Sequence, residues 1–156
     1  MKLAIGNDHI AIEMKNEIKE YLEGKDIEIV DVGTNSPERF HYPISGYKVA
    51  KLVSSGEVDG GVLICGTGVG ISLAANKVRG IRACVCSDPY TARLSKQHNN
   101  TNIIAFGARV IGVELAKMIV DAGTKLQTGF VGTPYLMHAL SSYGYTLFQK
   151  MFVFHL

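Results

Sequence analysis

The sequence predicts an α/β fold, a doubly wound, Rossmann-like three-layer sandwich with a five-stranded parallel sheet. Short apolar runs alternate with segments of helical periodicity, which is typical of βαβ units whose strands are covered on both faces. The chain has 156 residues, 47% of them hydrophobic, which matches one globular domain with a substantial core. Right-handed crossovers between parallel strands then give the doubly wound arrangement.

Five apolar runs are expected to be strands because each ends in glycine or polar residues. They are residues 2–7, 27–32, 62–65, 81–86 and 103–106. Five helices are expected from apolar residues spaced three and four apart. They are residues 12–22, 47–53, 71–77, 89–98 and 112–123. Residues 34–43 contain two prolines and are expected to form a loop.

The segment 61–70 is the most informative part of the chain. An apolar strand leads into Cys65, and a glycine-rich turn with Thr67 follows before the next helix. Glycines let backbone N–H groups point inward, and a helix N-terminus favours negative charge, so a thiol lies beside an anion cradle. The structural alternative is a small buried hydrophobe followed by a tight connection. The nucleotide-binding glycine fingerprints do not match.

Further polar residues lie near the predicted strand ends, where ligands bind in open α/β sheets. Asp8 and His9 follow the first strand, and Arg109 follows the fifth. His98 and Asn99 reach this rim only if the loop after their helix bends toward it. Helix capping is the alternative for several of these residues. A thiol, an imidazole, a carboxylate and an amide together suit proton transfer on a small polar substrate.

Composition excludes several classes of partner and cofactor. The net charge is +2 and the basic residues are scattered, which argues against nucleic acid and against a membrane surface. The cysteines are Cys65, Cys84 and Cys86, and none has zinc-site spacing, so we expect no metal. Cys84 and Cys86 alternate on one strand and should face the same side. The odd number of cysteines and the lack of a recognisable signal peptide favour the cytoplasm.

Several segments between residues 1 and 122 together match one enzyme family almost without gaps. They are residues 4–9, 42–43, 63–72, 75–77, 80–82, 86–90, 98–99 and 106–112. By these segments the chain resembles the type B ribose 5-phosphate isomerases, a family that also contains allose 6-phosphate and galactose 6-phosphate isomerases. We therefore predict an isomerase domain over residues 1–122 and an atypical tail over residues 123–156.

The resemblance implies an aldose–ketose isomerase that uses no metal or cofactor. Ribose 5-phosphate is the first expectation for the substrate, with ribulose 5-phosphate as the product, and the sites are implied to be shared between subunits of a homo-oligomer, a dimer or a tetramer. Cys65 is implied to be the base that moves a proton between C1 and C2, with His98 and Thr67 assisting ring opening. The implied substrate-binding residues are Asp8 and Asn99 for sugar hydroxyls, His9 and Arg109 near the phosphate, Tyr42 in the pocket, and the backbone of Gly66, Gly68, Val69 and Gly70 for the enediolate.

Two departures from the family pattern leave alternatives open. His41 replaces the aspartate that precedes Tyr-Pro in the ribose enzymes, and this form resembles one subunit of galactose 6-phosphate isomerase. In that enzyme the cysteine and the ring-opening histidine lie on different polypeptides, whereas this chain carries both. A self-sufficient homo-oligomer is therefore expected, with allose 6-phosphate or galactose 6-phosphate as alternative substrates.

The tail is the second departure. No arginine follows Arg109, and residues 126–149 contain no charged side chain, whereas the family has arginines there that clamp the phosphate. A tail that packs on a neighbouring subunit is one explanation, with residues 131–154 buried at that contact, and a frame-shifted gene is another. A weakly active sugar-phosphate binding subunit is the functional alternative. Glycine, proline and polar residues interrupt the run and argue against a membrane span.

Overall fold

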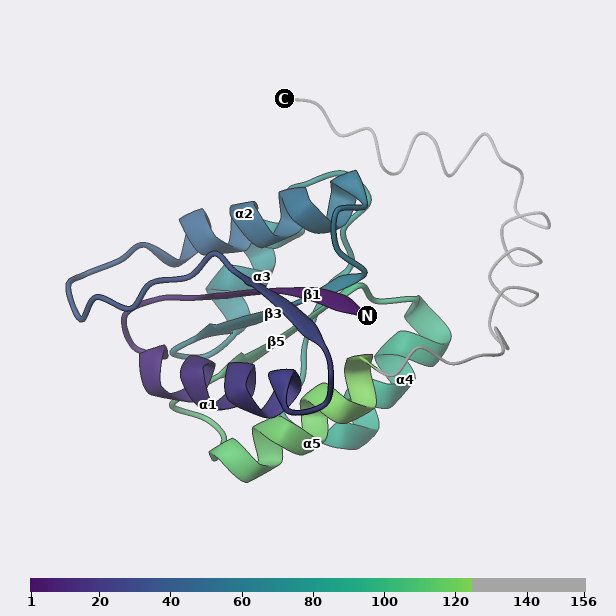
Figure 1. Cartoon of the computed structure of the whole chain (residues 1–156). Helices are drawn as coiled ribbons and strands as arrows, with labels where there is room; N and C mark the ends of the chain where they lie inside the picture. The colour runs from purple at the N-terminus through teal and green to yellow at the C-terminus, as the bar shows by residue number, and fades with distance from the viewer. Residues whose placement is uncertain (125–156) are drawn as a thin grey trace. The chain divides into compact units, whose positions relative to one another are not determined.

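The computed structural model describes residues 1–124, which form a parallel sheet with helices on both faces (Figure 1). The strands are β1 (Lys2–Asn7), β2 (Glu28–Asp31), β3 (Gly60–Cys65), β4 (Ala83–Val85) and β5 (Ile103–Gly107), in the order β2-β1-β3-β5-β4. The helices are α1 (Ile12–Glu23), α2 (Tyr42–Ser55), α3 (Val69–Ala75), α4 (Pro89–Asn99) and α5 (Val113–Thr124). The predicted fold class is confirmed.

Two hydrophobic cores hold the three layers together, one on each face of the sheet. Helices α1, α4 and α5 cover one face, and α2 and α3 cover the other (Figure 1). Successive residues of β3 point to opposite faces, so Ile64 packs with Ile18 and Ile119, while Leu63 packs with Val49 and Ile71. All six side chains are fully buried, and each contributes about 1.5–3 kcal/mol relative to exposure.

The predicted elements all exist in the predicted order, and one boundary is wrong by more than two residues. Helix α2 begins at Tyr42 instead of residue 47, because Pro43 lies in its first turn. Proline is compatible with the start of a helix, where its missing N–H would have no partner in the helix. The expected loop over residues 34–43 is therefore shorter, and Tyr42 is held by a helix.

The glycine turn after β3 packs closely against the end of β5. Gly68 has a φ of +80°, and a Cβ there would lie 2.8 Å from main-chain atoms of Phe106. A Cβ on Gly107 would lie 2.6 Å from the Cα of Thr67. Only glycine fits at these two positions, so the contact fixes the turn that follows Cys65.

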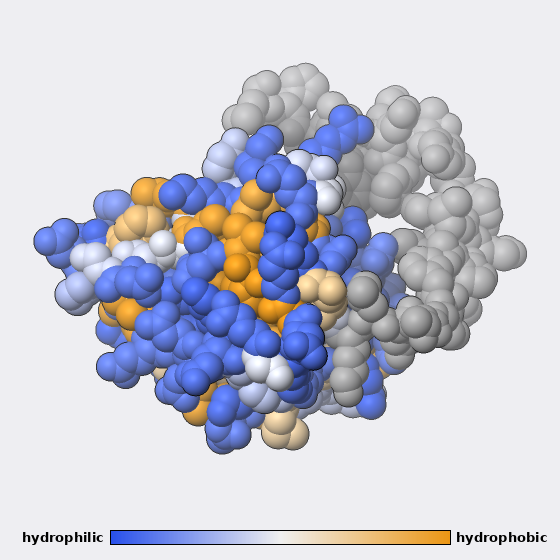
Figure 2. Space-filling model, viewed as in Figure 1, coloured by the Kyte–Doolittle hydropathy of each residue, from blue (hydrophilic) through white to orange (hydrophobic). Residues whose placement is uncertain are grey.

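The face of the molecule in Figure 2 is mostly hydrophilic, and its largest hydrophobic area lies between α2 and α1 at the sheet edge formed by β2. Strand β2 and the residue that follows it carry the partly buried side chains of Ile29, Val30 and Val32, which pack against the two cores. Within residues 1–124 we find no helix of the length and hydropathy needed to span a bilayer.

Gly68→Ala is expected to destabilise the fold more than Gly56→Ala. Both glycines have a φ of +80°, so alanine adds left-handed strain of about 1–2 kcal/mol at either position. Nothing lies within 4 Å of a Cβ on Gly56, whereas the contact with Phe106 should add about 1–3 kcal/mol at Gly68. Urea unfolding of both variants measures the difference. Equal losses in the free energy of unfolding would contradict the close contact.

Candidate active site

The ends of three neighbouring strands bring most of the predicted site residues to one edge of the sheet. Strand β3 lies between β1 and β5, and Cys65 pairs with Gly107. The N–H of Asp8 donates to the carbonyl oxygen of Ile64 at 3.2 Å. The carboxylate after β1 and the thiol at the end of β3 therefore belong to adjacent strands at the same edge.

The Cys65 thiol is held by the turn that follows it. Its side chain is buried, and its Sγ accepts a hydrogen bond from the N–H of Gly68 at 3.1 Å. Thr67 is exposed, and its Oγ1 accepts from the N–H of Val69 at 3.3 Å. The N–H of Gly68 is thus directed at the sulfur.

Arg109 lies beside the same turn. The N–H of Ala108 donates to the carbonyl oxygen of Cys65 at 2.8 Å, and the N–H of Arg109 donates to that of Gly66 at 3.1 Å. A Cβ built on Gly66 would lie 3.9 Å from the Cδ of Arg109, so the arginine side chain begins next to the glycine turn. Arg109 is exposed and brings a positive charge to this edge.

Asp8 and His9 are held by hydrogen bonds to the main chain. Asp8 is buried, and its Oδ1 accepts from the N–H of Ile10 at 3.0 Å. The Nδ1 of His9 lies 3.2 Å from both the N and the O of Phe40. The second imidazole nitrogen of His9 makes no hydrogen bond within residues 1–124, and neither does the Oδ2 of Asp8.

Tyr42 packs its ring on the first turn of α3. A Cβ on Gly70 would lie 2.7 Å from the Cζ of Tyr42, so only glycine leaves room for the ring. Tyr42 remains 41% exposed, and its hydroxyl lies near the turn that carries Val69 and Gly70. The ring of Tyr42, which belongs to α2, therefore lies beside the turn that follows Cys65.

His98 and Asn99 are not at this edge in the same chain. They end α4, which runs back along the sheet, and the chain then enters β5 at Ile103. Ile103 pairs with Gly61, whereas Gly107 pairs with Cys65, so the two edges are about 13 Å apart along the strands. The loop after α4 does not bend toward Cys65. One chain thus brings together every predicted site residue except these two, both of which are exposed.

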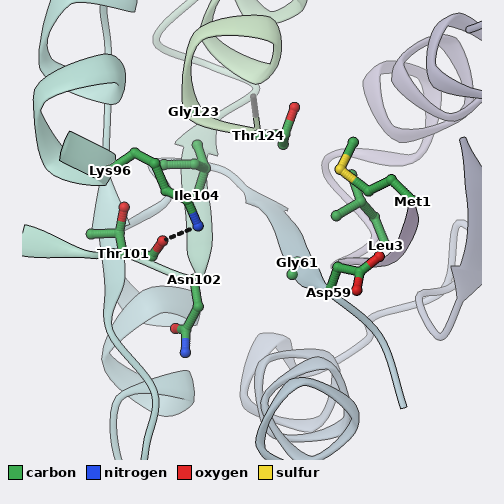
Figure 3. Close-up of a pocket in the computed structure, with 11 residues that line it drawn as sticks. Met1, Leu3, Asp59, Gly61, Lys96, Thr101, Asn102, Ile104, Gly123 and Thr124 are labelled. Atoms are coloured by element: carbon green, nitrogen blue, oxygen red, sulfur yellow. Dashed lines mark hydrogen bonds between the residues drawn. The ribbon is translucent and has the colours of Figure 1, made fainter. Parts of the chain in front are cut away.

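A small pocket at this opposite edge is shown in Figure 3. Residues from the starts of β1 and β3 and from the ends of α4 and α5 line it, among them Leu3, Gly61 and Lys96. The Nζ of Lys96 donates to the carbonyl oxygen of Thr101 at 3.0 Å, and burial, followed by the charge of Arg82, lowers the pKa of Lys96. The cavity volume of about 20 Å³ holds a single water rather than a sugar phosphate.

The other two cysteines face away from Cys65. Their sulfur atoms are 3.7 Å apart, which confirms that Cys84 and Cys86 point to the same side. Both pack in the core beneath α1, α4 and α5, whereas Cys65 belongs to the core beneath α2 and α3. Within residues 1–124 no three histidine, cysteine or acidic side chains are grouped as a metal site would need.

Sequence reasoning missed two buried polar residues near the site. Lys15 is fully buried in α1, and its Nζ donates to Asp31 at 2.7 Å and to Asn35 at 2.6 Å. Its spacing from the buried residues Ile18 and Leu22 places it on the apolar face of the helix, and this was the signal available in the sequence. Asn7 is also fully buried, and no sequence pattern identified its partners.

Comparison with known proteins identifies the family of the chain. The family model described as Ribose/Galactose Isomerase matches residues 3–132. This chain belongs to that family. Over 121 residues it is 60% identical to ribose-5-phosphate isomerase B of Escherichia coli K12, covering 78% of this chain and 81% of the relative. Over the same length it is 50% identical to galactose-6-phosphate isomerase subunit LacB of Clostridium acetobutylicum, covering 78% of this chain and 70% of that subunit.

A solved structure extends the similarity to the fold. The ribose-5-phosphate isomerase B of Clostridium thermocellum superposes with a TM-score of 0.80 at 47% identity, covering 92% of this chain and 100% of that one. The predicted resemblance to this isomerase family is confirmed. The predicted tail beyond Thr124 lies outside the described residues, and so do Lys125 and residues 131–154.

The free energy of unfolding is expected to fall as the pH rises above about 9. Burial, reinforced by Cys84, raises the pKa of Cys86 from an ordinary value of 9.0 to about 12. Between these values the folded state keeps a proton that the unfolded state has lost, which gives a limiting slope of about 1.4 kcal/mol per pH unit. Urea unfolding from pH 8 to 10 should show a shallower decline for Cys86→Ala than for the wild type or Cys65→Ala. Identical slopes in all three proteins would contradict the assignment.

Proposed function

We propose that this member of the ribose/galactose isomerase family interconverts ribose 5-phosphate and ribulose 5-phosphate. The observation that carries the proposal is the Cys65 sulfur, which accepts the Gly68 N–H at 3.1 Å at an edge that also holds Asp8 and Arg109. The 60% identity to a ribose-5-phosphate isomerase B favours ribose 5-phosphate among the sugars of the family. Allose 6-phosphate and galactose 6-phosphate are the alternative substrates.

The chemistry is a proton transfer between neighbouring carbons. The Cys65 thiolate removes the C2 proton of the open-chain aldose, and the electron pair moves to form an enediolate with its charge on the C1 oxygen. Main-chain N–H groups of the turn over residues 66–70 stabilise this anion, because preorganised donors are worth several kcal/mol against a developing charge. A proton passes from the C2 hydroxyl to the C1 oxygen within the enediolate, which moves the negative charge to the C2 oxygen. The thiol then returns its proton to C1, and the C2 oxygen becomes the ketone carbonyl as the thiolate is regenerated.

The substrate contacts follow from the residues that border the thiol. Asp8 holds a sugar hydroxyl through its carboxylate, and Tyr42 closes the side of the pocket. His9 and Arg109 attract the phosphate, since a charge-assisted hydrogen bond to an anion is about twice as strong as a neutral one. We assign Thr67 to ring opening together with His98.

Ring opening requires a second copy of the chain. His98 and Asn99 end α4 at the edge opposite Cys65, so the two residues can complete a site only on a neighbouring subunit. The exposed large apolar residues of α2 and α3 offer a surface for such a contact. They are Tyr42, Ile44, Tyr47, Val69 and Leu73. Grouped exposed apolar side chains mark protein contacts, and we therefore propose a homo-oligomer with shared sites.

A catalytically weak sugar-phosphate binding subunit is the second candidate. The absence of any arginine after Arg109 favours it, because Arg109 and His9 would then hold the phosphate alone. Thermal-shift binding of ribose 5-phosphate measured beside turnover separates the two candidates. The three cysteines are free thiols, which fits our proposal of a cytoplasmic enzyme.

Cys65→Ala is expected to lower kcat for ribose 5-phosphate by about 10²–10⁴-fold, the usual contribution of a general base. The fold should remain intact, because alanine fits the space of the buried thiol. Cys84→Ala is the matched control and should keep the wild-type rate, since Cys84 packs beneath the opposite face of the sheet. Turnover at the wild-type rate by Cys65→Ala would remove the thiol from the mechanism.

The KM for sugar phosphates is expected to be high. Relative to the family pattern, the chain lacks two arginines that would contact the phosphate. The loss of two such contacts, each worth about 1.5–3 kcal/mol, weakens substrate binding by about two to four orders of magnitude. A kinetic panel of ribose 5-phosphate, allose 6-phosphate and galactose 6-phosphate measures KM and the preferred sugar together. Lys125 or a lysine of a neighbouring subunit is the candidate substitute for the missing arginines. A KM in the submillimolar-to-millimolar range that Lys125→Ala leaves unchanged would show that the arginines are dispensable or that the phosphate is held elsewhere.

A further inference from the structure

Asn7 makes a bridge between the end of β1 and the segment that follows β2. Its side chain is fully buried. The Nδ2 group donates to the carbonyl oxygens of Asp8 at 2.8 Å and Thr34 at 3.1 Å, and the Oδ1 accepts from the N–H of Thr34 at 3.0 Å. The Asn7 amide thus links the N–H and the carbonyl oxygen of Thr34 to the main chain of Asp8, whose carboxylate belongs to the candidate site.

The fit around this amide is close. A Cβ on Gly33 would overlap the Oδ1 of Asn7, so glycine is needed at residue 33 for the amide to reach Thr34. The Oγ of Ser45 donates to the main-chain carbonyl oxygen of Asn7 at 2.8 Å. Asn7 is therefore bonded to Thr34, which lies in the connection between β2 and α2, and to Ser45, which lies in α2.

The connection between β2 and α2 reaches two residues of the candidate site, His9 and Tyr42. Phe40 contacts the Nδ1 of His9 at 3.2 Å. The connection ends at Tyr42, where α2 begins, and the ring of Tyr42 packs on Gly70 in the turn after Cys65. A displacement of the segment at Thr34 would change the position of Tyr42 relative to Asp8.

We propose that Asn7 is a positioning residue for substrate binding, which holds Asp8, His9 and Tyr42 in one fixed arrangement without touching the sugar. The inference rests on the proposed isomerase function. Cys65 is bonded within its own turn to Gly68, so Asn7 acts on the binding of the sugar rather than on the thiol. Loss of the amide should therefore raise KM and leave kcat nearly unchanged.

The chain offers a matched control for this test. Asn76 bridges the N–H and the carbonyl oxygen of Ala83, each at 2.9 Å, with the same pair of amide atoms that Asn7 uses on Thr34. Ala83 starts β4 and lies beside Ile103, at the edge away from Cys65. Asn7→Ala and Asn76→Ala thus remove the same type of bridge at two different edges of the sheet.

The experiment measures KM, kcat, melting temperature and hydrogen exchange of residues 34–41 for both variants. Asn7→Ala is expected to raise KM for ribose 5-phosphate by about tenfold or more, the change that corresponds to one lost hydrogen bond. It should also speed exchange in residues 34–41, whereas Asn76→Ala keeps the wild-type KM and the wild-type exchange there. If Asn7→Ala does not fold, Asn7→Ser is measured with the same expectation, because its hydroxyl is too short to span both groups of Thr34.

A lower melting temperature with an unchanged KM would overturn the proposal, because it would show that Asn7 is only structural. A loss of kcat at unchanged KM would overturn it as well. If the wild type does not turn over sugar phosphates, the proposed isomerase function fails separately. The Kd for ribose 5-phosphate and the hydrogen exchange of residues 34–41 then test the role of Asn7. A higher Kd and faster exchange in Asn7→Ala support the proposal, and an unchanged Kd overturns it.

Discussion

The direction of the parallel strands is the constraint on which the rest of this site depends. Every strand ends at one edge of the sheet, and each following helix carries the chain back to the other edge. Asp8, Cys65 and Arg109 therefore gather at one edge, while His98 at the end of α4 lies at the opposite one. A mechanism that uses both Cys65 and His98 must draw them from different subunits.

Close packing between the glycine turn and β5 fixes the thiol. Gly68 and Gly107 lie so near to main-chain atoms of the facing segment that no side chain fits at either position. The N–H of Gly68 is directed at the Cys65 sulfur as a result. The hydrogen bonds of Ala108 and Arg109 to the carbonyl oxygens of Cys65 and Gly66 join the two strand ends from the other side. Main-chain contacts thus form much of the site. The only sign of these contacts in the sequence is the position of the glycines.

The sequence predicted the sheet, the helices and the thiol edge because apolar periodicity and glycine positions report on local structure. It failed where a partner lies far along the chain. The loop predicted over residues 34–43 is wrong at its end, because Pro43 fits the first turn of α2. The buried bridges of Lys15 to Asp31 and of Asn7 to Thr34 join residues 16 and 27 positions apart, and no local pattern encodes such pairs. The place of His98 depends on the length and direction of α4, which only the assembled fold determines.

Subunit mixing tests the central claim of shared sites most directly. Cys65→Ala and His98→Asn chains are unfolded together and refolded at equal amounts, and ribose 5-phosphate turnover is compared with that of each parent. In a mixed dimer with shared sites, one site receives an intact Cys65 and an intact His98, so about a quarter of wild-type activity should return. Activity no higher than the mean of the two parents would contradict a site built from two copies of this chain.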